Sequence, residues 1–295
     1  GGGGCRARGG GGRGSAQGDI IGDIINHGKK QYWLPTASHH YHCTLAKGEN
    51  TLEAQLLLVL LESMSATNGV FSASEFRARY ITFMTTPGSH NDAYASTCHR
   101  MFFANLKHKG LAPEKCPDND SHNVDTIDGI LPVIATALAN LQNDRATQVA
   151  TASECMAVTR RSQQLPKYGA IFSDCLTSVA SNQDDLNSSL MKAAKQMGVR
   201  LTPPPASDPV TACYLDSAFP SLLQMAHKYQ SDAAIGLLAN ANCGGENVHR
   251  GIALGALLGA SHGIHGIDQK WRTGLKDHER INGIIERFVA AVGTA

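Results

Sequence analysis

Hydrophobic residues recur with helical spacing along most of the chain. From Thr51 to Met64 the sequence combines strong helix formers with apolar residues on most faces, which predicts a buried helix. Strand-like alternation is scarce, so we predict an all-α bundle of about nine or more helices. The other segments with helical spacing are Thr126–Leu141, Gln148–Arg160, Lys167–Ser178, Leu186–Met197, Tyr214–Tyr229, Asp232–Asn240, His249–His262 and Asp277–Val292.

Turn and capping signals divide these helices. The turn sequence from Thr85 to Gly88 precedes Ser89, and Asp92 follows three positions later. This spacing resembles a capping box and predicts a helix that begins at Ser89 and continues through residues 93–106. The proline-rich segment Leu201–Pro209 is predicted to link two helices.

The amino-acid composition and net charge limit the kinds of molecule that the protein is expected to bind. The chain has 295 residues, of which 42% are hydrophobic, enough for a large core. Only 17% are charged and the net charge is +1, so nothing draws it strongly to nucleic acid or to a membrane surface. A small polar ligand fits this balance better, and we expect a monomer.

The sequence also bears on compartment. Its eight cysteines are scattered without a CxxC pair, which is typical of reduced thiols. The chain contains neither an apolar run of 18 residues nor a recognisable signal peptide, so we expect an intracellular soluble protein, cytoplasmic in the first instance. Because the chain begins with glycine, organelle targeting stays an alternative.

The first 17 residues differ from the rest. Gly1–Gly14 consist almost entirely of Gly and Arg, which cannot bury apolar surface, and we predict a disordered tail over residues 1–17. Residues 18–295 are predicted to form a single helical domain. An RNA-binding role of the tail is an alternative.

Candidate chemistry is concentrated at Gly244–His249. Gly244 and Gly245 permit a tight turn, and Glu246, Asn247 and His249 follow where a helix begins. Such groups can hold a ligand or a metal ion, whereas spacing by itself favours the alternative of simple capping by Asn247. The helix that follows has small residues along one side, which predicts a central position; its glycines are Gly251, Gly255 and Gly259.

A second Gly-Glu-Asn sequence occurs at Gly48–Asn50, followed by Thr51, at the start of the first long helix. Two such helix starts could converge on one divalent ion through carboxylate, amide and hydroxyl oxygens. Chance recurrence of the tripeptide is the alternative. The predicted metal ligands are Glu49, Asn50, Thr51, Glu246, Asn247 and His249.

These stretches resemble the ADP-ribosylglycohydrolase family, and in particular its J1-crystallin-like branch. The resemblance is carried by Gly48–Leu56, Phe83–Phe103, Cys116–Val133 and Gly244–Gly263 and spans residues from about 18 to 290. It implies an all-α orthogonal multi-helix bundle that cleaves the glycosidic bond of ADP-ribose, in a protein or related conjugate, with paired Mg²⁺ ions.

The chain departs from the family's metal motifs. The family usually has Thr/Ser-Asp-Asp-Thr before the first long helix, where this chain has Glu49-Asn50-Thr51. It has Gly-Gly-Asp-x-Asp-Thr/Ser later, where this chain has Glu246, Val248 and His249. Because fewer and longer carboxylates remain, one Mg²⁺ ion, a softer ion or no ion are all open.

The resemblance also implies residues that bind the substrate, ADP-ribose or an ADP-ribosylated conjugate. Capping or other structural use is the alternative for all of them. We take Glu49 as the first candidate for the catalytic carboxylate and Glu246 as the second. The predicted substrate-binding residues are Ser89, His90, Asn91, Asp92, Asn123, Asp125, Asp128, Gly244 and Gly245.

Two further groups of residues are interpreted as structural or solvated. His39–His42 is interpreted as a solvated loop, and His99 and Arg100 as structural residues within a helix.

The leading functional hypothesis is a hydrolase of ADP-ribose conjugates. The alternative is a non-catalytic binder of ADP-ribose, or a structural relative comparable to the J1 crystallins.

Overall fold

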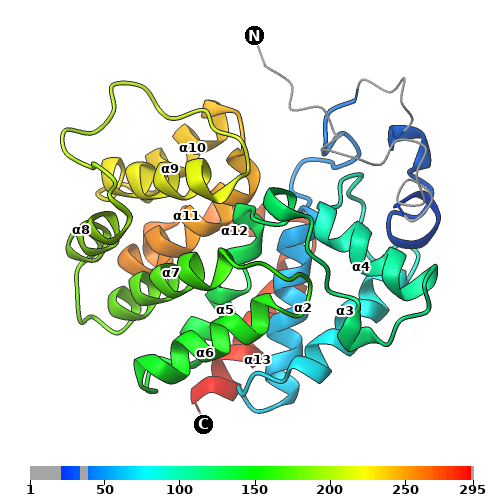
Figure 1. The fold of residues 1–295 in the computed structure, drawn as a ribbon. Coiled ribbons are helices and arrows are strands. Elements are labelled where there is room, and N and C mark those ends of the chain that lie inside the picture. Colours follow the sequence, from blue (N-terminus) through cyan, green and yellow to red (C-terminus); the bar gives the residue numbers. More distant parts are fainter. Residues whose placement is uncertain (1–20, 34–38, 294–295) are drawn as a thin grey trace.

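The computed structural model describes residues 21–33 and 39–293, so the predicted tail over residues 1–17 lies outside the described residues. Figure 1 shows a bundle of helices that cross at steep angles. Within the described ranges there is no β-strand, only an isolated bridge between Thr126 and Tyr214. The all-α prediction is therefore confirmed.

The described chain consists of α-helices with a few short 3₁₀ or π turns before α2, between α4 and α5, and between α11 and α12. The first turns are η1 (Ile21–Ile25) and η2 (Lys30–Trp33). The α-helices that follow are α2 (Leu52–Ala66), α3 (Ala73–Thr85), α4 (Thr97–Lys107), α5 (Val133–Ala139), α6 (Arg145–Met156), α7 (Leu165–Ala180), α8 (Leu186–Met197), α9 (Leu215–Lys228), α10 (Ala233–Cys243), α11 (Asn247–His262), α12 (Gln269–Thr273) and α13 (His278–Gly293). The remaining turns are η3 (Pro113–Lys115), η4 (Ser121–Asn123), η5 (Ile127–Ile130) and η6 (Ile264–Gly266).

Two large hydrophobic clusters fill the bundle. One is built by α2, α3 and α4, with Phe288 of α13 packed into it. The other is built by α5 to α11 and includes Leu254 and Leu257 of α11. Figure 1 shows α13 running beside α2, so the last described helix packs against the first long α-helix. Helix α11 contacts α7, α9 and α10, as predicted for a central helix.

Local pattern predicted most helices to within a few residues. The prediction of Leu186–Met197 coincides with α8, and Thr51–Met64 corresponds to α2. The predicted helix Thr126–Leu141 is instead divided into η5 and α5, since Pro132 has no N–H group to continue the hydrogen-bond ladder. Helix α3 was missed, although Ser72 accepts a hydrogen bond from the Glu75 amide, as in a capping box.

The helix predicted to start at Ser89 begins eight residues later, at Thr97. Asp92 does not cap its own helix. Its carboxylate accepts hydrogen bonds from the amides of Leu52, at 2.8 Å, and Tyr94, at 3.1 Å. The contact with Leu52 satisfies the start of α2, so a tertiary interaction takes precedence over the local capping pattern.

The structure also bears on membrane-spanning helices and on the state of the cysteines. No helix in the described ranges combines the length and apolar character needed to cross a bilayer. All seven cysteines of the described residues are free thiols.

Candidate functional site

A cavity with a volume of about 560 Å³ opens at the start of α11. We call it the central cavity. Its walls come from the turn before α11, the connection before α9, the η4–η5 segment, and residues 40–42 and 94–97. Segments far apart in the sequence thus meet here.

The turn before α11 depends on glycine. Gly244 and Gly245 have φ values of +80° and +66°, in the left-handed region that L side chains rarely adopt. A Cβ on Gly245 would lie 2.7 Å from the Thr211 carbonyl oxygen. That same oxygen accepts a hydrogen bond from the Glu246 amide at 2.9 Å, so the turn is held directly against the cavity wall.

Glu246 rather than Asn247 caps α11. Its Oε1 accepts a hydrogen bond from the His249 amide at 3.1 Å. Asn247 is already inside the helix, and its side-chain amide donates to the carbonyl of Ala241. The interpretation of Asn247 as the cap is therefore wrong, because the helix begins one residue earlier than the pattern suggests and Asn247 is its first residue.

His249 is one of the buried polar residues of the central cavity. Its side chain is 5% exposed, and Nδ1 lies 3.0 Å from Oε1 of Glu246. In the described part of the chain neither ring nitrogen has a well-directed hydrogen bond. Burial favours the neutral ring, yet the charge of Glu246 outweighs this and raises the pKa of His249 to about 10. In turn, although burial opposes ionisation of Glu246, the charge of His249 lowers the pKa of Glu246.

Asp128 supplies a second carboxylate. It accepts hydrogen bonds from the Thr126 hydroxyl and, at 2.8 Å, from the guanidinium of Arg160. Both members of the Asp128–Arg160 pair are 2% exposed. Burial disfavours the charged carboxylate, but the Arg160 charge prevails and lowers the pKa of Asp128.

His42 forms the opposite wall, where sequence reasoning expected a solvated loop. Its Nδ1 lies 2.8 Å from Oδ1 of Asp92, the residue that caps α2. The ring of His42 lies 6.5 Å from that of His249, centroid to centroid. His40 and Tyr41 also line the cavity; the solvated-loop interpretation is wrong for the half-buried Tyr41 and His42, whereas His39 and His40 are exposed. Nothing in the sequence near His42 signals this, because its partner lies fifty residues away.

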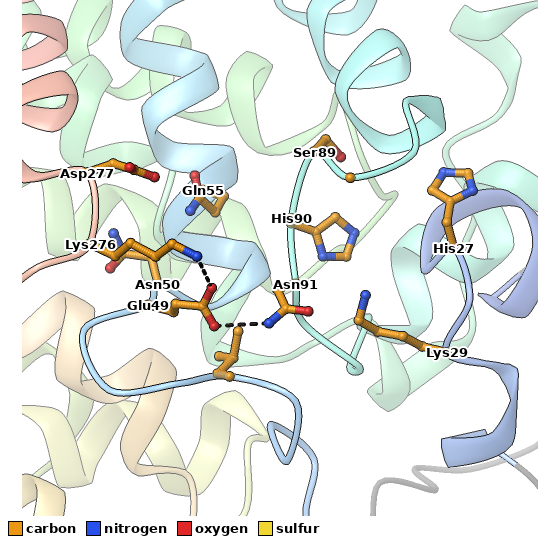
Figure 2. A pocket seen from close by; sticks show the side chains of 12 residues that line it. His27, Lys29, Glu49, Asn50, Gln55, Ser89, His90, Asn91, Lys276 and Asp277 are labelled. Carbon is orange, nitrogen blue, oxygen red and sulfur yellow. Dashed lines mark hydrogen bonds and ion pairs between the residues drawn. The ribbon is translucent and has the colours of Figure 1, made fainter.

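The smaller cavity, of about 290 Å³, holds the other half of the predicted site (Figure 2). Oε1 of Glu49 contacts Nζ of Lys276 at 2.8 Å, and Oε2 accepts hydrogen bonds from the Ala46 amide and the Asn91 side chain. The pKa of Glu49 is lowered to about 2, mainly by the hydrogen bond from Lys276 and further by those from Ala46 and Asn91. Both oxygens of Glu49 are therefore engaged.

The structure divides the predicted site residues between the two cavities. Three predicted residues line neither cavity: Thr51, Asp92 and Asp125. Asp92 contacts His42 of the central cavity. Asp125 accepts a hydrogen bond from the Ser162 hydroxyl. The central cavity is lined by Asn123, Asp128, Gly244, Gly245, Glu246, Asn247 and His249. The smaller cavity is lined by Glu49, Asn50, Ser89, His90 and Asn91.

The donor set can be tested against a pair of Mg²⁺ ions. Tight Mg²⁺ sites use carboxylate oxygens that are free to face the ion. Here Glu246 faces His249, Asp128 faces Arg160, and Glu49 faces Lys276 on the far side of Asp92. Among the described residues no three His, Cys, Asp or Glu side chains are grouped to hold a metal ion. These side chains do not fit the paired ions.

Comparison with known proteins gives one family. A family model described as ADP-ribosylglycohydrolase matches residues 10–295. No curated protein sequence matches the chain. Among solved structures, a chain of an "ADP-ribosylglycohydrolase-related protein complex" matches with a TM-score of 0.64 and 16% identity, and 94% of each chain is covered. At this identity the similarity establishes the fold alone, and the J1-crystallin-like branch stays a prediction.

Proposed function

Because the chain belongs to the ADP-ribosylglycohydrolase family, we propose that its central cavity binds the ADP-ribose part of a conjugate and hydrolyses the glycosidic bond to the acceptor. The family supports a hydrolase of ADP-ribose conjugates in general. We assign the reaction to this cavity because of the buried pair Glu246–His249. Nε2 of His249 lacks a hydrogen-bond partner among the described residues, so it can meet a ligand.

The dimensions and chemistry of the central cavity support a nucleotide-sugar ligand. Its volume of about 560 Å³ falls in the range typical of small-molecule sites. Tyr94 and Tyr214 offer aromatic surface, while Asn123 and His249 offer polar groups. Rigid aromatic walls with a few fixed polar groups are the usual means of orienting such a ligand.

The proposed reaction uses two side chains of the chain itself. A water molecule adds its oxygen to the anomeric carbon as the bond from that carbon to the acceptor breaks. The proton released by the water passes to Glu246, and the acceptor takes a proton from Nε2 of His249. Oε1 of Glu246 already contacts His249, so Oε2 is the oxygen proposed to receive the proton from water.

Glu49, the first candidate from the sequence, is less suited to this role. Its two oxygens are bonded by Lys276, Ala46 and Asn91, and its pKa of about 2 makes it a weak base. It also lines the smaller cavity. We therefore assign the base to Glu246.

The test is an assay of ADP-ribose release from peptides modified on Arg, Ser or acyl acceptors. We expect Glu246→Gln to lower the rate by about 100-fold or more, as for loss of a general base. Glu49→Gln, the matched control, should retain the rate within a few-fold. A loss confined to Glu49→Gln would move the base to the smaller cavity, and no release from any acceptor would refute the hydrolase proposal.

One observation favours a second function, a non-catalytic binder or a structural relative. Each carboxylate at the central cavity is already paired with a basic side chain of the chain itself, so catalytic bases are scarce. Calorimetric titration with ADP-ribose separates the alternatives. Binding without release from any conjugate indicates a binder, and neither binding nor release indicates a structural role.

A further inference from the structure

Five carboxylates surround the starts of α2 and α11, and each faces a basic side chain of the same protein. Two of these pairs stand at the helix starts themselves: Asp92 with His42 at α2, and Glu246 with His249 at α11. The pairs and their shortest N–O distances are Glu49–Lys276 at 2.8 Å, Glu53–His99 at 2.6 Å, Asp92–His42 at 2.8 Å, Asp128–Arg160 at 2.8 Å and Glu246–His249 at 3.0 Å.

These contacts compete directly with a divalent cation. A hard ion binds a carboxylate through the same oxygen lone pairs that accept an N–H group, so each ligand must first be released from its partner. Apart from Lys276, the basic partners are at most 12% exposed, so they cannot turn into solvent when an ion arrives. An ion would therefore leave buried basic groups without their carboxylates, which is unfavourable.

The two imidazoles occupy the space between the helix starts. His42 and His249 meet edge to face at 6.5 Å between ring centroids, with Asp92 behind one ring and Glu246 behind the other. Nε2 of His249 is buried and has no hydrogen-bond partner in the described ranges, and the residue lines the central cavity. A buried donor left unpaired in this way is a strong candidate to meet a ligand oxygen.

We propose that His42 and His249 take the places that divalent cations would hold between the starts of α2 and α11, and that the central cavity binds its ligand without a metal ion. His249 contributes Nε2–H to an oxygen of the ligand: under the proposed reaction this is the ribose hydroxyl at the anomeric carbon, where a conjugate carries its acceptor, and the other candidate is a phosphate. The choice of ADP-ribose as the ligand rests on the proposed function; the displacement of the metal does not.

The metal part is tested with Mn²⁺ alone on the full chain, by electron paramagnetic resonance or calorimetry. We expect no saturable binding below about 1 mM, the upper end of the dissociation constants of dedicated divalent-ion sites. Saturable binding of one or two Mn²⁺ ions at micromolar concentration would overturn the proposal. This measurement needs neither a variant nor a ligand, so it is decisive even if ADP-ribose does not bind.

The ligand part is tested by calorimetric titration with ADP-ribose in EDTA and in Mg²⁺. The affinity of the wild-type protein should be equal in the two buffers, and a requirement for Mg²⁺ would overturn the proposal. Free phosphate and ribose, titrated separately, identify which group His249 meets. Absence of all ADP-ribose binding would refute the proposed function and leave the Mn²⁺ result standing.

The contribution of His249 itself is measured with His249→Leu, which removes both ring nitrogens. We expect ADP-ribose to bind about tenfold more weakly or worse, as for loss of a hydrogen bond from a charged donor. The matched control is His262→Leu, at the other end of α11, where the ring bonds the Gln230 carbonyl outside the cavity. Unchanged affinity in a folded His249→Leu protein would overturn the donor role, and if that variant does not fold, the EDTA comparison on the wild type decides.

Discussion

At the scale of single residues, the site consists of charges that are buried in pairs. Glu246 and His249 change each other's protonation: the pKa of the carboxyl is lowered and that of the imidazole is raised to about 10. Glu49 shows the same effect at the protein surface, where its partner Lys276 is 62% exposed. The buried pair is the one whose charge state should affect stability, because exposed pairs are screened by water.

This pair predicts a pH dependence of stability. The pKa of His249 rises on folding from about 6.5 to about 10, so its stabilising contribution is complete below pH 6.5 and is lost as the pH rises through about 10. Thermal unfolding of wild type and His249→Leu, followed from pH 6 to pH 10.5 in steps of about half a unit, measures this. The difference in Tm between the two proteins should shrink toward high pH. A difference that stays constant over this range would contradict the charged pair.

At the scale of elements, helix packing brings the last described helix against the first long α-helix. Helix α13 lies along α2 (Figure 1). Just before α13, the Lys276 amide donates a hydrogen bond to the Gly48 carbonyl at 2.8 Å. Gly48 has a φ of +84°, and a Cβ there would lie 2.5 Å from the Gly274 carbonyl oxygen. The C-terminal helix thus fixes the segment that leads into α2 and, with it, one wall of the smaller cavity.

Two neighbouring residues of α13 test the importance of this packing. Phe288 is 5% exposed and belongs to the cluster around α2, whereas Val289 is 60% exposed. We expect Phe288→Ala to lower the free energy of unfolding by about 3–5 kcal/mol, through lost burial and the cavity left behind. Val289→Ala should change it by less than about 0.5 kcal/mol. Chemical denaturation gives both values, and equal effects would show that α13 does not pack on α2 as described.

At the scale of the whole molecule, a buried network ties the two halves of the bundle together. Arg160 follows α6 and donates to Asp128, to the Thr126 hydroxyl and to the Val124 carbonyl. Asp128 lines both the central cavity and a small void of about 20 Å³ that it shares with Glu53 and His99. Charges from α2, α4, η5 and the end of α6 therefore meet behind the central cavity.

Breaking this network should destabilise the whole fold. Asp128→Asn keeps the shape of the side chain but removes the charge that faces Arg160, and we expect a loss of about 3–5 kcal/mol in the free energy of unfolding. The control is Asp174→Asn, whose partner Arg145 is 65% exposed, with an expected loss below about 1 kcal/mol. Urea unfolding compares the two. A small loss at Asp128 would mean that Arg160 is satisfied by its other acceptors.

The sequence by itself determined the fold class and the positions of most helices. Helix α8 and its Asp185 cap, whose carboxylate accepts from the Ser188 amide at 2.7 Å, involve residues three or four positions apart, and such local interactions are visible in a sequence. The glycines before α11 also marked the cavity correctly, because a left-handed turn requires them whatever surrounds it.

Only the tertiary structure decided which side chains meet at the site. His42 pairs with Asp92 across 50 positions, and Lys276 with Glu49 across 227. Spacing predicted a capping box from Ser89 to Asp92 and a shared ion site for Glu49 and Glu246. Instead, Asp92 bonds the start of α2 and Glu49 lines another cavity. These partners are determined by how whole helices pack, so no local sequence pattern predicts them.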